Sequence, residues 1–271
     1  MKLSSLVRRL GASLTAGVLS LSSHAAVTTQ LGFVWDESGS LSNAEFNLMK
    51  NGYLAAINAL PTDGSIELTI VTYSTDAVTL VAPVVFTAAT KAAVVATVTA
   101  NLQDGGSTAT GAGIERAAQL MRASSQYLPS LRSIINLATD GIANVGSPNG
   151  QQAAINAATA ARNNGIDALT AEFVGTASGG AQALRDIVFS PNCGPANDCG
   201  VVITDTNLLT DPMSATARPW VLDVADFRDF EAALIRKVAV VTGTIPEPSA
   251  LALAGLALAG LAMTRRRTIA A

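Results

Sequence analysis

The chain has 271 residues, with 17 Lys and Arg against 20 Asp and Glu, and 49% of its residues are hydrophobic. This length suits one domain with short appendages, and the charged fraction of 14%, against about 25% in typical globular proteins, argues against a disordered chain. Because six of the basic residues lie at the two ends, residues 27–248 hold 11 basic and 20 acidic residues, a net charge of −9 that disfavours nucleic acid and anionic membranes as ligands.

The first 26 residues have the pattern of a signal peptide. Lys2, Arg8 and Arg9 precede an apolar run over residues 10–21, which is followed by small residues. This run is shorter than the roughly 20 residues that a membrane-spanning helix needs. Export would remove His24, the only histidine. A mature chain without histidine cannot contain a Ser-His-Asp triad, a Cys-His pair or a His-ligated zinc, so we expect that the protein is not an enzyme.

Between the two ends, predicted strands and helices alternate. A capping box, Ser42 with Glu45, predicts the start of the first helix, and Pro83 makes the third strand an edge strand. Strands are expected at residues 30–35, 66–73, 77–85, 132–139, 166–173 and 220–224, and helices near residues 42–57, 90–102, 114–121, 151–163, 180–189 and 227–238. This alternation predicts an α/β fold, a Rossmann-like doubly wound and mostly parallel sheet with helices on both faces.

Residues 190–218 interrupt this alternation and are interpreted as an insertion with a small extra strand or hairpin. They lie in a helix-to-strand connection, so we expect them at the amino-terminal end of the parallel strands. Cys193 and Cys199 lie in this insertion. In an exported chain with two cysteines, a disulfide between them is the expected state.

Oxygen-bearing side chains gather at the predicted carboxyl ends of two strands. The first strand is followed by Asp36-Glu37-Ser38-Gly39-Ser40, and the fourth ends at Asp140. Thr108 lies in a glycine-rich loop before a helix, with Thr110 as an alternative donor two residues later. Ligands of doubly wound sheets bind at this edge, and carboxylate and hydroxyl oxygens suit a hard cation. Glu37 is expected to point to solvent, with an influence on metal selectivity as the alternative.

These three segments resemble the von Willebrand factor type A domain, over roughly residues 28–240. The resemblance implies a metal-ion-dependent adhesion site in which Ser38, Ser40 and Thr108 offer hydroxyl oxygens. Asp36 and Asp140 would bind the ion directly or through water. The expected ion is Mg²⁺, with Mn²⁺ or Ca²⁺ as alternatives, and its open position would accept a carboxylate from a partner. The alternative is that the Ser and Thr side chains cap helices, the Asp side chains end strands, and no metal binds.

The carboxyl end has a second recognisable pattern. Pro246-Glu247-Pro248 precedes an apolar run from residue 249 and then three arginines, at residues 265–267. This pattern resembles the PEP-CTERM sorting signal of Gram-negative bacteria, which implies processing by an exosortase and delivery to the cell envelope. We therefore expect a linker at residues 242–248, a transmembrane helix at 249–264 and a basic cytoplasmic tail at 265–271. Before processing, the protein would be anchored in the inner membrane and face the periplasm.

The sequence thus predicts an exported cell-envelope protein with a signal peptide at residues 1–26 and a von Willebrand type A domain at residues 27–241. The domain would bind a divalent cation and, through it, an acidic group on a protein or surface polymer. The alternative is a metal-free structural module of the envelope or exopolysaccharide matrix. An enzyme that uses metal-activated water is disfavoured because it lacks a convincing general base: Glu37 is the only nearby candidate in the sequence.

Overall fold

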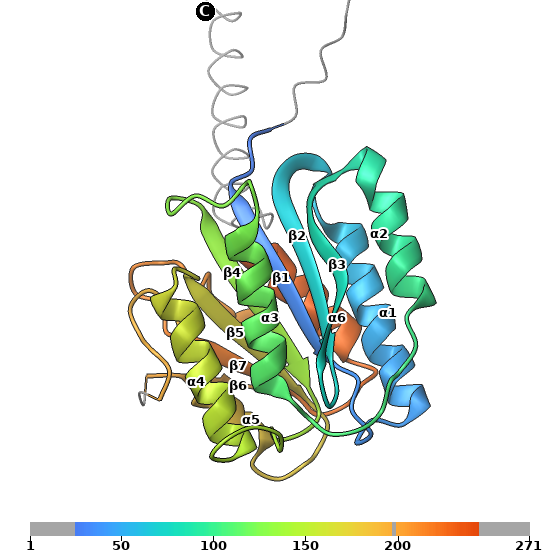
Figure 1. Ribbon diagram of the computed structural model, residues 1–271, viewed down its shortest axis with the longest axis vertical. Helices are drawn as coiled ribbons and strands as arrows, with labels where there is room; N and C mark the ends of the chain where they lie inside the picture. The colour runs from blue at the N-terminus through green and yellow to red at the C-terminus, as the bar shows by residue number, and fades with distance from the viewer. Residues whose placement is uncertain (1–24, 197–198, 244–271) are drawn as a thin grey trace, which may run out of the picture.

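A seven-stranded sheet forms the centre of the molecule (Figure 1). The structure, a computed structural model, describes residues 25–196 and 199–243. The strand order is β3-β2-β1-β4-β5-β7-β6, and all neighbouring pairs are parallel except β2 with β3. The strands are β1 (Thr29–Asp36), β2 (Asp63–Tyr73), β3 (Ala77–Thr87), β4 (Arg132–Thr139), β5 (Ala168–Val174), β6 (Val201–Ile203) and β7 (Trp220–Val224). The predicted mostly parallel sheet is confirmed, with β3 at one edge.

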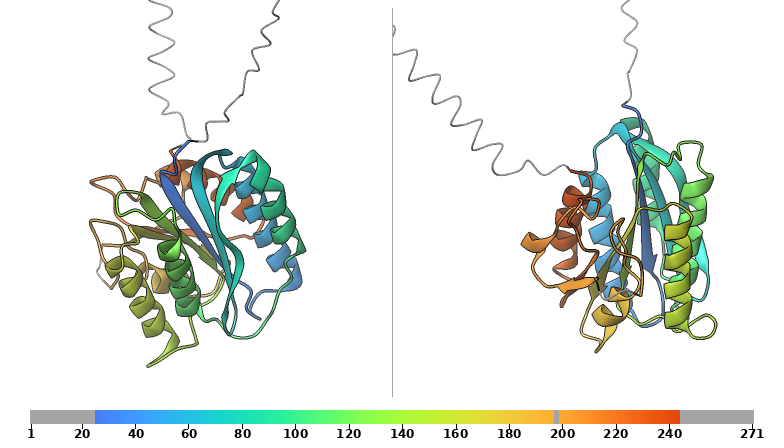
Figure 2. Two further views of the ribbon diagram at one scale, coloured as in Figure 1. Left: turned by 45° about the horizontal axis from the view of Figure 1, so that its top comes forward. Right: turned by 90° about the vertical axis from the view of Figure 1, so that its left-hand side faces the viewer.

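Helices cover both faces of this sheet, as the right-hand view of Figure 2 shows. One face packs against α1 (Asn43–Ala59), α2 (Ala88–Ala100) and α6 (Phe230–Val241). The other packs against α3 (Thr110–Ala123), α4 (Gly150–Asn163) and α5 (Gly180–Arg185). A short 3₁₀-helix, η1 (Thr206–Leu208), lies between β6 and β7 in the chain. The mixed α/β architecture follows from strands that must bury apolar side chains on both faces.

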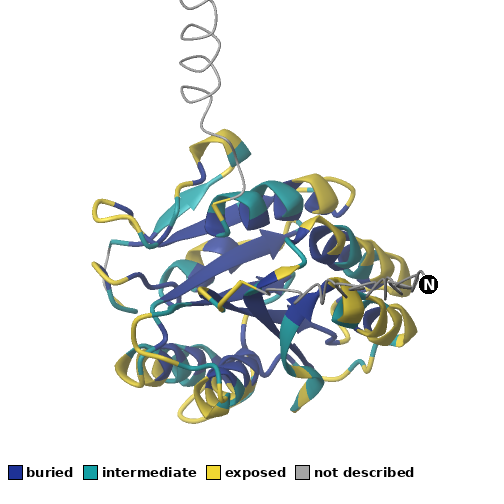
Figure 3. Cartoon of the chain, turned by 90° about the horizontal axis from the view of Figure 1, so that it is seen from above, coloured by how far each residue is buried: buried dark blue, intermediate teal, exposed yellow. Residues whose placement is uncertain are grey.

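Strands β1 and β5 are buried along their whole length, and β4 is buried at every residue after Arg132 (Figure 3). In β1, Phe33 and Trp35 face α1 and α6, whereas Val34 faces α3 and α4, because successive side chains alternate between the two faces. Tyr53 of α1 packs against both aromatic rings of β1, at centroid distances of 5.1 Å and 4.3 Å, and against Phe230 of α6 at 5.7 Å. This aromatic cluster joins both helices to the sheet.

The start of α1 is set by a local sequence signal, whereas the end of α5 is set by a tertiary contact. At α1 the predicted capping box is confirmed: the Glu45 N–H donates to Ser42 Oγ, and the Ser42 N–H donates to the Glu45 carboxylate. Helix α5 ends at Arg185, four residues before the expected end. The chain turns there because Phe189 pairs with Leu169 at the start of β5, a long-range contact that local periodicity does not contain.

The insertion at residues 190–218 adds β6 as a short edge strand parallel to β7. Arg132, the first residue of β4, forms an ion pair with Asp211 at 2.7 Å, and Arg162, near the end of α4, donates to the Pro191 carbonyl. These contacts place the parts of the insertion near Pro191 and Asp211 at the amino-terminal end of the parallel strands, as expected. The expectation is wrong for the middle of the insertion, because β6 runs parallel to β7 and brings Thr204 and Thr206 beside Val224, at the carboxyl end of β7. Cys193 and Cys199 are joined by a disulfide, with Cα atoms 6.2 Å apart.

The remaining expectations for the two ends concern residues outside the described part of the chain. These are nearly all of the signal peptide, Pro246, Glu247 and Pro248 of the sorting signal, the helix at 249–264 and the basic tail at 265–271. Within residues 25–196 and 199–243, none of the helices has the length and hydrophobicity to span a bilayer.

Gly52 provides a test of the contact between α1 and α6. A Cβ atom there would lie 2.5 Å from Phe230 Cδ1. Helix propensity alone favours Gly52→Ala by about 1 kcal/mol, whereas overpacking costs about 1–3 kcal/mol. We expect the clash to dominate, so that Gly52→Ala lowers the free energy of unfolding in urea denaturation. In a Phe230→Leu background the same change should become neutral or stabilising; equal destabilisation in both backgrounds would contradict this packing.

Candidate metal centre

The site begins where β1 and β4 end side by side. Their parallel register pairs Trp35 with Ala138, so Asp36 and Thr139 are the next residues on both strands. Thr139 Oγ1 donates a hydrogen bond to Asp36 Oδ2 at 2.5 Å, and the Ser38 N–H donates to Asp36 Oδ1 at 2.7 Å. Both carboxylate oxygens of the fully buried Asp36 are therefore held in place. This residue anchors the turn that carries the two serines.

Three hydroxyls and a second carboxylate continue from this anchor as one hydrogen-bonded cluster. Ser38 Oγ lies 2.9 Å from Ser40 Oγ and accepts a hydrogen bond from Thr108 Oγ1 at 3.2 Å. Ser40 Oγ donates to Asp140 Oδ1 at 2.7 Å. Ser38 and Thr108 are buried, Ser40 is exposed and Asp140 is half-buried. The structure thus brings together all five side chains that the sequence singles out, and the cluster opens to solvent at Ser40 and Asp140.

The glycine-rich loop reaches this cluster because it packs closely against the turn after β1. The Gly39 N–H donates to the Gly106 carbonyl at 2.9 Å, and the Gly105 N–H donates to the Glu37 carbonyl at 2.8 Å. Gly106 has φ +87°, and a Cβ atom there would lie 2.5 Å from Thr75 Oγ1. A larger residue would therefore be strained and would push the loop, with Thr108, away from the serines.

Asn144 is a positioning residue that sequence reasoning missed. Its Oδ1 accepts from the Thr108 N–H at 2.8 Å, and its own N–H donates to the Thr108 carbonyl at 3.1 Å. Asn144 thus ties the loop after β4 to the loop that carries Thr108. Thr139, which holds Asp36, was also missed as a site residue, although its place directly before Asp140 was a usable signal.

The structure distinguishes between the two threonines of the loop. Thr108 is the one whose hydroxyl meets Ser38. Thr110 is the first residue of α3, is buried and lies beside Tyr73 on β2. Burial raises the pKa of Tyr73, and the Thr110 side chain opposes only part of that rise. Thr110 therefore belongs to the support beneath the cluster.

The expectation that Glu37 points to solvent is wrong. Glu37 is 4% exposed, and its carboxylate accepts a hydrogen bond from Asn101, the residue directly after α2. Strand alternation places Glu37 on the same side as Trp35, two residues before it, where α1 and α2 cover the sheet. Burial raises the pKa of Glu37, and the hydrogen bond from Asn101 partly opposes that rise. The side chain connects α2 to the end of β1 and does not face solvent.

The electrostatics of the cluster favour a cation. Burial raises the pKa of Asp36 to about 6, even though hydrogen bonds from Thr139 and Ser38 lower it. Burial also raises the pKa of Asp140. In the described part of the chain, no Lys or Arg forms an ion pair with either carboxylate. A bound cation would favour the charged form of both groups.

The donor set also fits a hard ion in shape and chemistry. A Cβ atom at Gly141 would lie 3.6 Å from Ser40 Oγ and 3.7 Å from Thr108 Oγ1, so the glycine leaves space between these two hydroxyls. No cluster of three or more His, Cys, Asp or Glu side chains suited to a metal occurs among the described residues. An ion here would therefore be held by two carboxylates and three neutral hydroxyls.

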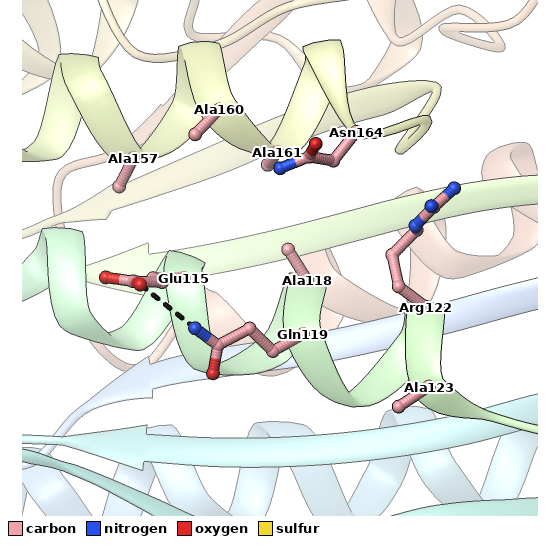
Figure 4. Close-up of a pocket in the computed structure, with 9 residues that line it drawn as sticks. All are labelled: Glu115, Ala118, Gln119, Arg122, Ala123, Ala157, Ala160, Ala161 and Asn164. Atoms are coloured by element: carbon pink, nitrogen blue, oxygen red, sulfur yellow. Dashed lines mark hydrogen bonds between the residues drawn. The ribbon is translucent and has the colours of Figure 1, made fainter.

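The groove between α3 and α4 is separate from this cluster (Figure 4). Alanines form most of its wall, with Glu115, Gln119, Arg122 and Asn164 also lining it. Gln119 Nε2 donates to Glu115 Oε1 at 2.9 Å, so these two polar groups satisfy each other. None of the five clustered oxygen donors lines the groove, and we assign it no chemistry.

The hydrogen bond from Thr139 to Asp36 leads to a measurable expectation. Thr139→Val removes a donor that favours the charged carboxylate, so the pKa of Asp36 should rise further above about 6. NMR titration of the carboxyl carbon in the presence of a chelator measures this shift. Thr170→Val is a matched control, because the Thr170 hydroxyl is buried without a hydrogen-bond partner on β5. An unchanged Asp36 titration in Thr139→Val would contradict the assigned role.

Solved structures with the same fold come from several sources. A structure of proximal thread matrix protein 1 from the mussel byssus, described with a zinc-occupied MIDAS motif, is 18% identical with a TM-score of 0.57; the alignment covers 80% of this chain and 48% of that one. The pilus adhesin SpaC from Lactobacillus rhamnosus GG is 13% identical with a TM-score of 0.57, over 79% and 30% of the two chains. This chain thus spans about half or less of these two proteins.

A conserved hypothetical protein, BatB from Bacteroides thetaiotaomicron, is 14% identical with a TM-score of 0.50, over 79% of this chain and 99% of that one. No curated protein matches the sequence. Two family models match it: the von Willebrand factor type A domain over residues 30–214, more than half of the chain, and the PEP-CTERM protein-sorting motif over residues 244–267. The chain therefore belongs to the von Willebrand factor type A domain family and carries a PEP-CTERM sorting motif near its carboxyl end.

Proposed function

We propose that this protein is exported to the cell envelope and binds a divalent cation through Asp36, Ser38, Ser40, Thr108 and Asp140. Through that ion it would hold an acidic group on a partner protein or surface polymer. One observation carries this proposal: oxygen donors from three distant segments form a single hydrogen-bonded cluster that opens to solvent. The alternative, in which these hydroxyls only cap helices or turns, does not explain why they lie together with two carboxylates.

The balance of charge in the cluster explains why an anionic ligand would be recognised. Three of the five donors are neutral hydroxyls, and the two carboxylates would bind the ion directly or through water. Because hydroxyl oxygens donate little charge, an ion held this way keeps affinity for a further carboxylate. The rest of residues 27–248 carries a net negative charge and would repel an acidic ligand elsewhere on the surface. Adhesion or scaffolding therefore fits the site better than catalysis.

The chemistry of the donors favours Mg²⁺, with Mn²⁺ as a close substitute. Both accept oxygen ligands in octahedral geometry, whereas Ca²⁺ usually takes 6–8 oxygens at longer distances, about 2.3–2.6 Å. The mussel protein of the same fold has zinc in its MIDAS motif, which supports a divalent ion in general. Binding measurements with each ion would establish the order of preference.

The sorting motif supports a location in the envelope of a Gram-negative bacterium. We propose that residues 1–26 direct export, that residues 249–264 form a transmembrane helix before processing, and that an exosortase acts at Pro246-Glu247-Pro248. The domain at residues 27–241 would then be presented at the cell envelope or cell surface. This arrangement places the candidate metal centre where it could meet surface polymers or other envelope proteins.

Calorimetry with Mg²⁺ and Mn²⁺ tests the metal site. We expect saturable binding of one ion per chain. Asp140→Ala and the Ser38→Ala, Ser40→Ala double variant should weaken it by at least the roughly 10–100-fold that the loss of an outer-shell partner costs a metal site. Thr108→Ala should act in the same way, whereas Ser107→Ala, one position earlier in the same loop, should leave affinity unchanged. Circular dichroism checks that each variant is folded. Absence of binding by the native protein at millimolar ion would refute the metal site and leave the metal-free structural module.

A surface experiment tests the ligand class. The protein should adhere to a carboxylated sensor surface in Mg²⁺ and detach when a chelator is added, because its net negative charge otherwise opposes contact. A surface that carries neutral amides is the control and should retain nothing in either buffer. Retention on the carboxylated surface that survives the chelator would show that binding does not pass through the ion.

A further inference from the structure

A second polar cluster lies inside the core, between the sheet and α6, and the metal site does not use it. Lys237 of α6, Glu172 of β5 and Asn136 of β4 are 1%, 0% and 2% exposed. The Lys237 ammonium forms an ion pair with Glu172 Oε1 and lies 5.0 Å from the centre of the Trp220 ring. Aromatic and aliphatic side chains surround this pair in the larger of the two core clusters.

As a simple ion pair, Lys237 and Glu172 would lack hydrogen-bond partners among the described residues for the ammonium and for the carboxylate oxygens. An ammonium has three N–H donors, yet apart from the ion pair neither Lys237 Nζ nor the Glu172 oxygens make a well-aligned hydrogen bond with the described residues. Burial lowers the pKa of Lys237 to about 8 and raises the pKa of Glu172. Both shifts favour the neutral amine of Lys237 and the protonated carboxylic acid of Glu172. In a site without bulk water, the amine is a nucleophile and the acid is a proton donor.

Asn136 provides an electrophile beside this pair. Its Nδ2 donates to the Tyr53 hydroxyl at 3.2 Å, and its Oδ1 has no hydrogen-bond partner in the described part of the chain. In the parallel register Asn136 is opposite Thr170, so Glu172 lies two residues further along the neighbouring strand and on the same face. The Asn136 side chain is close enough to lower the pKa of Glu172. Glu172 therefore contacts the lysine and adjoins the amide.

We propose that Lys237 and Asn136 become joined by an intramolecular amide bond, with Glu172 as the group that transfers protons. The Glu172 carboxylate takes a proton from the Lys237 ammonium, and the free amine attacks Cγ of Asn136. Glu172 then returns the proton to Nδ2 of Asn136, and the Cγ–Nδ2 bond breaks. The departing ammonia takes up a second proton from the attacking nitrogen of Lys237 and leaves as ammonium. One C–N bond forms and one breaks, Glu172 ends as it began, and no oxidant or cofactor is required.

The product would remove the cost of the buried charge. An amide link retains one N–H donor and one carbonyl acceptor in place of an ammonium and a primary amide. The link would also join α6 to β4, a central strand of the sheet. Helix α6 ends at Val241 and the sorting motif begins at residue 244. Any pull from an envelope attachment would thus reach α6 first, and the link would transfer it to β4.

Mass spectrometry of a tryptic digest of the full chain tests this proposal directly. Asn136 lies in the tryptic peptide of residues 133–162, and a free Lys237 would itself be a cleavage site. We expect residues 133–162 joined to the peptide that begins at Lys237, lighter than the sum of the two by one ammonia, with no cleavage after Lys237. Cleavage after Lys237 in the native protein would refute the bond. A link from Lys237 to the peptide of residues 163–185, with loss of water, would also refute it, because Glu172 would then be the electrophile.

Two variants separate the roles of the residues. Glu172→Gln preserves shape but cannot transfer the proton, so it should restore cleavage after Lys237. Asn136→Asp should yield the same linked product with loss of water in place of ammonia. Circular dichroism checks that both variants are folded. If one of them does not fold, the digest of the native chain alone tests the proposal. Reduction of the Cys193–Cys199 disulfide before digestion prevents that link from contributing to the masses.

Discussion

The parallel pairing of β1 with β4 is the constraint on which the functional edge of this protein depends. Because the two strands run side by side in register, they end together, and Thr139 can hold the carboxylate of Asp36. The turn after Asp36 then places Ser38 and Ser40 over the end of β4, beside Asp140. A shift of one residue in this register would move Asp36 to the opposite face of the sheet and disperse the cluster.

The loops that complete the cluster are held by backbone contacts and by neutral side chains. Gly105 and Gly106 bond to the turn after β1, and Asn144 bonds to both the N–H and the carbonyl of Thr108. Glu37 is buried on the other side of the turn and connects it to the end of α2. No described Lys or Arg forms an ion pair with Asp36 or Asp140, and Asp140, the less buried of the two, lies beside the exposed Ser40. The fold therefore gathers the five oxygen donors at one edge of the sheet and supports them mainly through backbone and neutral side-chain hydrogen bonds.

The cluster of oxygen donors at the strand ends and the Lys237–Glu172 cluster in the core differ in their access to solvent. At the ends of β1 and β4, Asp36 is buried and Asp140 is half-buried beside the exposed Ser40, and no Lys or Arg of the described residues forms an ion pair with either carboxylate. In the core, Glu172 is paired with Lys237, and both are closed off from water. A buried charge must be paired with an opposite charge or neutralised, whereas a charge near the surface is stabilised by water and can bind an ion from solvent. The same sheet holds both clusters, one inside the α1 and α6 layer and one at the ends of its strands.

The amino-acid sequence by itself determined the alternation of strands and helices, the capping box at Ser42 and the identities of the five clustered oxygen donors. These are local signals: periodicity of apolar residues, a helix cap, and short motifs placed directly after strands. Only the tertiary structure decided that Glu37 is buried, that Thr108 rather than Thr110 meets the serines, and that α5 ends at Arg185. It also revealed Asn144, and the meeting of Lys237, Glu172 and Asn136. Each of these depends on which segments pack together across a long separation in the chain, and no local pattern of residues contains that information.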